Sequence, residues 1–133
     1  MKRNVLNIIV KIKPLILQHA NESLWGNVDE ANRSYYAYTW EICKAFSDGY
    51  GIDISEALAA DYEPALQTIG AFYLLPYKTK YAVSILKRIS KSDHIEVSIN
   101  ASSILKEWHK KSLRFPRLIS GKVAYIAMTE HKP

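Results

Sequence analysis

Apolar residues return every three or four positions along most of this chain, which is the spacing of one face of an α-helix. The first such stripe lies in residues 4–20 and consists of Val5, Ile8, Ile9, Ile12, Leu15, Ile16 and His19. Pro14 lies within the same segment. Because proline removes a backbone hydrogen bond, we expect Pro14 to kink this helix or to begin a second one.

The same periodicity predicts further helices. One spans residues 28–47 and ends where two glycines follow. The region 53–75 is the most apolar of the chain, and Pro64 divides it into two helices. The last two helices are predicted at 79–91 and 101–113. We expect the side chains of region 53–75 to form the centre of the core.

Two segments near the C-terminus follow a different pattern. Residues 94–99, HIEVSI, alternate strictly between polar and apolar, which is typical of a strand, although a short run of this kind can become helical once it is packed. Residues 117–129 indicate two short strands that turn at Ser120 and Gly121. We therefore predict a mainly α fold, a single domain over 1–133 with five to six helices and a small C-terminal antiparallel β element.

The predicted helix 28–47 holds more aromatic rings than one stripe accommodates. Its core stripe consists of Ala31, Tyr35, Tyr38, Ile42 and Phe46. Tyr36 and Trp40 lie outside this stripe, about 120° round the helix. Either a second neighbouring helix packs on these two rings, or they are exposed and available to a protein partner, since tyrosine and tryptophan are enriched at binding hot spots.

Charge is segregated along the sequence. The net charge is +5, but residues 1–44 contribute +2, residues 45–77 contribute −5 and residues 78–133 contribute +8. The middle block has no lysine or arginine at all. Such asymmetry says little about the fold, but it bears on which partners the protein meets.

The acidic block and the aromatic pair suggest a surface that binds a protein. The candidate partner-binding residues are Tyr36, Trp40, Asp48, Tyr50, Asp53, Glu56, Asp61, Tyr62 and Glu63. We favour a non-enzymatic protein-binding module. Most concretely, we expect a bacterial immunity protein or antitoxin, that is, an inhibitor that covers the active surface of a toxin such as a basic nuclease. A solvated face with acids at helix starts is the simpler alternative.

The basic C-terminal half indicates an alternative function, nucleic-acid binding. Its candidate residues are Lys80, Lys87, Arg88, Lys91, Lys106, Lys110 and Lys122. The predicted order of elements is similar to a winged-helix domain, although only one helix lies between strand and hairpin where that pattern has two. The resemblance implies that Ser102, Ser103, Lys106 and Lys110 face the groove and that Lys122 lies at the tip of the wing.

Catalytic motifs are missing from the sequence. No nucleophile elbow, phosphate-binding glycine loop or zinc-protease motif occurs, and the four histidines are scattered. Cys43, the only cysteine, is expected to be a small core residue. We therefore expect no catalytic residues, no metal, no cofactor and no small-molecule substrate. Lys11 and Lys13 interrupt the first apolar run, so we expect no membrane segment and a cytoplasmic location.

Overall fold

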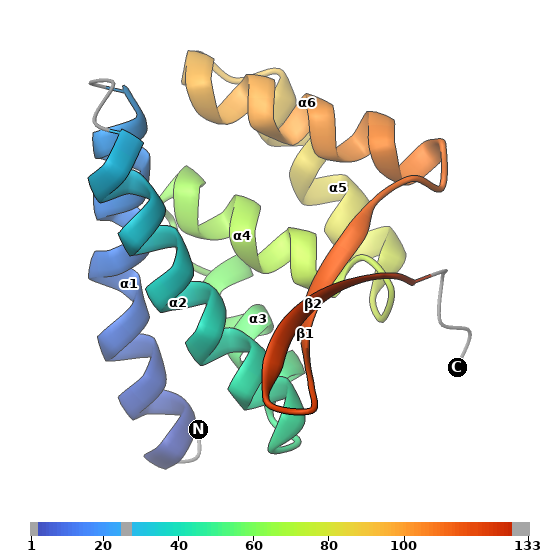
Figure 1. Cartoon of the computed structure of the whole chain (residues 1–133). Helices are drawn as coiled ribbons and strands as arrows, with labels where there is room; N and C mark the ends of the chain where they lie inside the picture. Colours follow the sequence, from blue (N-terminus) through green and yellow to red (C-terminus); the bar gives the residue numbers. More distant parts are fainter. Residues whose placement is uncertain (1–2, 25–27, 129–133) are drawn as a thin grey trace.

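The N-terminal part of the protein is an antiparallel pair of helices. In the computed structural model, which describes residues 3–24 and 28–128, α1 (Arg3–Leu24) and α2 (Val28–Ser47) lie side by side (Figure 1). The predicted stripe of α1 faces the protein interior, with Val5, Ile12 and Ile16 buried. The amphipathic spacing of the sequence therefore positions this helix as predicted.

Pro14 lies inside α1 without dividing it, so the expectation of a second helix starting there is wrong. The proline removes the bond that would end at the carbonyl of Val10, four residues earlier. Pro14 is exposed, and Val10 is 66% exposed. Water can therefore hydrogen-bond the carbonyl that the proline leaves without a helical partner, and the helix continues.

Four shorter helices follow, and the second of them lies at the centre of the fold. They are α3 (Gly51–Ala59), α4 (Pro64–Leu74), α5 (Thr79–Ser90) and α6 (Ile95–His109). Pro64 begins α4 as predicted, in the position where a missing N–H costs nothing. Helix α4 contacts α1, α3, α5 and α6, which agrees with the expected central place of this apolar segment.

The segment 94–99 is helical, so the strand predicted from its alternation is wrong. Val97 also has helical spacing to Ala101 and Ile104, and all three pack in the core. Ile95 and Ile99 point away from that face and are 72% and 61% exposed. The segment is therefore helical because a helix packs Val97 on the same face as Ala101 and Ile104. The alternation of polar and apolar residues does not determine its structure.

The C-terminal hairpin is confirmed. Strand β1 (Arg114–Ile119) pairs antiparallel with β2 (Lys122–Ala127). Ser120 and Gly121 connect the strands, with φ of 51° and 77°. Two consecutive positive φ values are typical of the tight turn that matches the twist of a hairpin. The protein is thus mainly helical with a small two-stranded sheet at its C-terminus.

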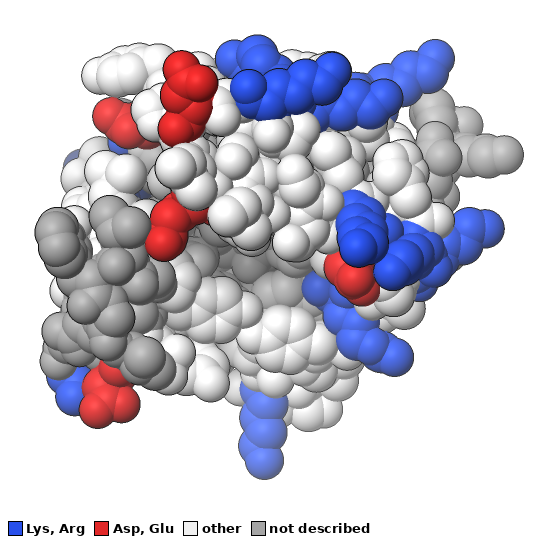
Figure 2. All heavy atoms as spheres, turned by 90° about the horizontal axis from the view of Figure 1, so that it is seen from above, with Lys and Arg blue, Asp and Glu red and all other residues white. Residues whose placement is uncertain are grey.

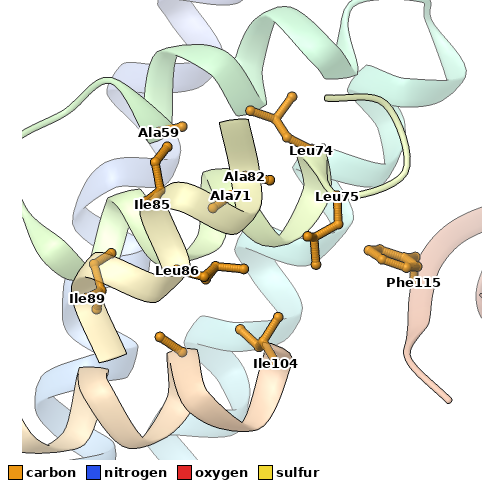
Figure 3. Close-up of a cluster of buried hydrophobic side chains, with 11 residues drawn as sticks. Ala59, Ala71, Leu74, Leu75, Ala82, Ile85, Leu86, Ile89, Ile104 and Phe115 are labelled. Atoms are coloured by element: carbon orange, nitrogen blue, oxygen red, sulfur yellow. The ribbon is translucent and has the colours of Figure 1, made fainter. Parts of the chain in front are cut away.

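The buried apolar side chains form two clusters. The first joins α3, α4, α5, α6 and the hairpin and contains Ala59, Ala71, Leu74, Leu75, Ala82, Ile85, Leu86, Ile89, Ala101, Ile104 and Phe115 (Figure 3). The second joins α1 to α4 and contains Val5, Ile12, Ile16, Tyr38, Ile42, Ala45, Ile54, Leu58, Leu66 and Tyr73. Phe72 packs against both clusters and stacks on Phe115 with ring centroids 4.7 Å apart.

Candidate functional site

The aromatic pair of α2 is exposed. Tyr36 and Trp40 are 66% and 42% exposed, while Tyr38 and Ile42 on the predicted core stripe are buried. The ring of Tyr35 lies 5.6 Å from that of Tyr36, and its hydroxyl lies 2.7 Å from the hydroxyl of Tyr125 on β2. Of the two alternatives for Tyr36 and Trp40, the structure shows the exposed one.

Two of the five acids in the middle block have cationic partners from outside it. The ammonium of Lys13 lies 2.7 Å from the carboxylate of Asp61, and Lys78 pairs with Glu56. Asp48, Asp53 and Glu63 are exposed, and Asp48 accepts a hydrogen bond from the half-buried Tyr50. The sequence suggested an uncompensated acidic block because these lysines lie outside it in the chain.

The predicted partner-binding residues do not form one surface. Lys11 of α1 pairs with Glu41 of α2, whereas Lys13 pairs with Asp61 in the turn after α3. Positions two apart project about 200° from each other on a helix, so α2 and this turn flank α1 on opposite sides. The aromatic pair of α2 is therefore separated from Asp61, Tyr62 and Glu63 by the width of α1.

Two other predicted acids line a groove. This groove has a volume of about 780 Å³ and is lined by Val5, Asp53, Glu56, Ala57, Ala60, Lys78 and Tyr81. Tyr62, in the nearby turn, is 87% exposed.

Helix α1 also exposes three apolar side chains, Leu6, Val10 and Leu17. Sequence reasoning missed these three, although their spacing of four and seven residues predicts a second apolar stripe.

The predicted basic residues lie mainly over α5 and α6. On α5, Lys80, Lys87 and Arg88 are exposed, and Lys91 caps its end. Lysine and arginine gather at two places on the face seen in Figure 2, along one edge and toward the C-terminal end of α6. The tertiary structure thus brings most of the predicted cations to neighbouring helices.

The outward face of α6 is defined by six residues that point away from the core. They are Ile95, Ile99, Ser102, Ser103, Lys106 and Lys110, all exposed. A shallow pocket of about 270 Å³ lies along part of this face, lined by Ser98, Ile99, Ser102, Ser103 and Lys106. Sequence reasoning found the serines and lysines but missed the two isoleucines, because it placed them on a strand.

Helices α4, α5 and α6 follow one another around the first core cluster, and only residues 91–94 separate α5 from α6. Because 94–99 is helical, two consecutive helices precede the hairpin, as in the winged-helix pattern. The hairpin itself departs from that pattern, since it lies across α2, where the Arg117 guanidinium stacks 3.9 Å from the Phe46 ring. Its turn, next to Lys122, lies far from α6 (Figure 1).

Cys43 is fully buried, as the sequence predicted for a core residue. Burial raises the pKa of its thiol to about 11, because the charged thiolate loses its hydration inside the protein. The thiolate is the reactive form of cysteine. The side chain is therefore suited to packing and poorly suited to nucleophilic chemistry.

The Lys13–Asp61 pair gives a pH-dependent prediction. The hydrogen bond from Lys13 lowers the pKa of Asp61 below its usual value of 3.8, so the pair stabilises the fold above that pH and loses its effect as pH falls through the lowered pKa. We expect Lys13→Met to lower the free energy of unfolding by about 1 kcal/mol or less at pH 7. In urea titrations the difference should shrink as pH falls below 3.8 through the lowered pKa of Asp61, with Lys80→Met as the control; a difference that does not change with pH would contradict the pairing.

Comparison with known proteins identifies no relative: no protein family, no curated protein and no solved structure matches the chain. Among residues 3–24 and 28–128, no three His, Cys, Asp or Glu side chains are grouped so as to hold a metal ion. Within the same residues, every helix is too short or too polar to cross a membrane.

Proposed function

We propose that the protein binds double-stranded DNA through the outward face of α6. The proposal rests on one observation: this face combines two lysines, two serines and two isoleucines on an exposed helix that follows α5 through a short turn. The major groove of B-DNA is about 12 Å wide and admits one α-helix. In helix-turn-helix proteins the second helix of such a pair lies in that groove.

Each residue type of the face has a counterpart on the duplex. The ammonium groups of Lys106 and Lys110 bind phosphate oxygens, and this contact is independent of sequence. The hydroxyls of Ser102 and Ser103 donate to phosphates or base edges. The exposed Ile99 side chain contacts the methyl group of thymine, which only the major groove presents.

The charge around α6 favours this proposal. Lys87, Arg88 and Lys91 lie on the neighbouring helix, and Lys111 and Arg114 follow α6 directly. The two acids of α6 border the outward face: the exposed Glu96 also lines a cavity on the flank, and the half-buried Glu107 accepts a hydrogen bond from Ser112. The six residues of the outward face include no carboxylate, and the five cations named above outnumber the two acids at its border.

A salt titration tests the proposal. Fluorescence anisotropy with a labelled random-sequence duplex of about 20 base pairs should show binding that weakens on the order of a hundredfold between 50 and 200 mM salt, as for about four phosphate contacts. Duplex RNA of the same length should bind more weakly, because its major groove is too narrow and deep for side chains to read. Salt-insensitive binding, or none at 50 mM salt, would refute the proposal.

The acidic groove supports a second candidate function, the binding of a basic protein, which includes the neutralising partner of a toxin. Asp53 and Glu56 line this groove together with Val5 and Tyr81. Lys78 also lines it and pairs with Glu56, so the groove offers apolar contact and an excess of one negative charge. Complementary charge speeds the encounter with a basic partner and disfavours wrong ones. This groove lies on a surface built from α1, α3 and α5, and α6 does not line it.

The double variant Asp53→Lys with Glu56→Lys tests this second candidate, because both carboxylates line the groove. If the groove binds a basic partner, a stoichiometric complex purified with the wild-type protein should be weakened at least tenfold in the variant, because two carboxylates become cations. Asp29→Lys with Asp93→Lys gives the same change in net charge at other exposed sites. Unchanged affinity of the groove variant, or equal loss in the control, would refute the acidic groove as the binding site.

A further inference from the structure

A cavity of about 430 Å³ lies between α1, α2, α4 and α6. Its apolar lining includes Ile16, Tyr38, Ile69 and Val97. Small-molecule sites in proteins are cavities of roughly 300–1,000 Å³ that are mostly apolar with a few polar groups. The size and lining of this cavity place it within that class.

The packing of the helices explains why the space is open. Helix α6 is anchored to the first core cluster through Val97, Ala101 and Ile104, and its N-terminal half faces α1 and α4 across the cavity. The facing side chains of Ala20 and Ala65 are too short to fill the space between the helices. Asn21, Glu96 and Asn100 of its lining are exposed, so the space is a cleft that opens to solvent.

The polar groups of the cavity define the chemistry of a ligand. Glu96 is the one carboxylate among the described lining residues, and no lysine or arginine lines the cavity with it. The ring of His19 lies 5.9 Å from that of Tyr38 in an edge-to-face arrangement, so the wall beside them is aromatic. The hydroxyl of Thr68 donates to the carbonyl of Pro64, so toward a ligand it can act only as an acceptor.

We infer that this cavity binds a small aromatic amine. The ring lies among Ile16, Ile69 and Val97, where it displaces water that makes few hydrogen bonds, and the ammonium group pairs with Glu96. An aromatic anion is disfavoured, because it would bring a second negative charge next to the same carboxylate. The cavity lies on the flank of α6, so this inference does not depend on DNA binding by the outward face.

Three probes that share one ring system test the inference on the full chain: tryptamine, indole and indole-3-acetate, titrated by calorimetry at pH 7. We expect affinity to fall in that order, with tryptamine at least tenfold tighter than indole-3-acetate. Glu96→Gln keeps the size of the side chain and should weaken tryptamine about tenfold while leaving indole unchanged. Equal affinity for the amine and the acid, or no binding by any probe, would overturn the inference.

A second variant tests the location. Ala65→Met places a longer side chain in the cavity and should abolish binding of tryptamine, whereas Ala37→Met on the exposed face of α2 should not change it. Circular dichroism establishes that both variants are folded. Tryptamine binding that survives Ala65→Met in the folded protein would overturn the assignment of the site to this cavity.

Discussion

Replacing Lys106 and Lys110 together by glutamate is expected to lower the affinity for duplex DNA by at least a hundredfold. Both lysines lie on the outward face of α6, one turn apart, where both can contact phosphates of a bound duplex. Each replacement removes one phosphate contact and adds a charge that repels the duplex. The slope of log affinity against log salt should fall by about 1.8, because each lost contact contributes about 0.9.

The control is a double variant with the same change in net charge at a different place. Lys44 lies on the exposed side of α2, and Lys122 lies next to the hairpin turn, away from α6. Lys44→Glu with Lys122→Glu should change the affinity by less than about threefold at 150 mM salt, since distant charges are largely screened there. If both double variants lose affinity equally in anisotropy titrations, overall charge governs binding and the proposal for α6 is wrong.

Gly70→Ala is expected to destabilise the protein by about 3 kcal/mol, because the new methyl group would overlap the backbone of a neighbouring helix. A Cβ atom at Gly70 would collide with the backbone nitrogen of Ala59 and lie 2.5 Å from the carbonyl oxygen of Ser55. Backbone atoms of a packed helix cannot rotate away as a side chain can. Helices α3 and α4 would have to separate, which weakens the contacts of Leu58 and Leu66 in the second core cluster.

Helix propensity alone predicts the opposite sign for this substitution. Alanine is favoured over glycine by about 1 kcal/mol in the middle of a helix, so an open site would gain stability. Urea unfolding at pH 7 measures the difference. Gly49→Ala is the comparison: its φ is 94° and nothing lies within 4 Å of the added Cβ, so only backbone strain of about 1 kcal/mol is expected. A Gly70→Ala protein as stable as wild type would contradict the close approach of α3 and α4.

The sequence alone determined the local structure of the protein. Helical spacing of apolar residues depends only on neighbours within a few positions, so α1, α2, α5 and the break at Pro64 were predictable. The hairpin was predictable because Ser120 and Gly121 suit a tight turn. The prediction that Tyr36 and Trp40 lie outside the core stripe of α2 was also correct, because the angular position of each residue around a helix follows from its place in the sequence.

Only the tertiary structure decided which side chains are exposed together and which charges are paired. Segment 94–99 fits both a strand and a helix, and it is helical because Val97 is then buried with Ala101 in a shared core. Two carboxylates of the acidic block, Asp61 and Glu56, form ion pairs with Lys13 and Lys78, and in each pair the partners are more than 20 positions apart in the sequence. Burial and ion pairing depend on residues that meet only after folding, so their outcome cannot be read from local spacing.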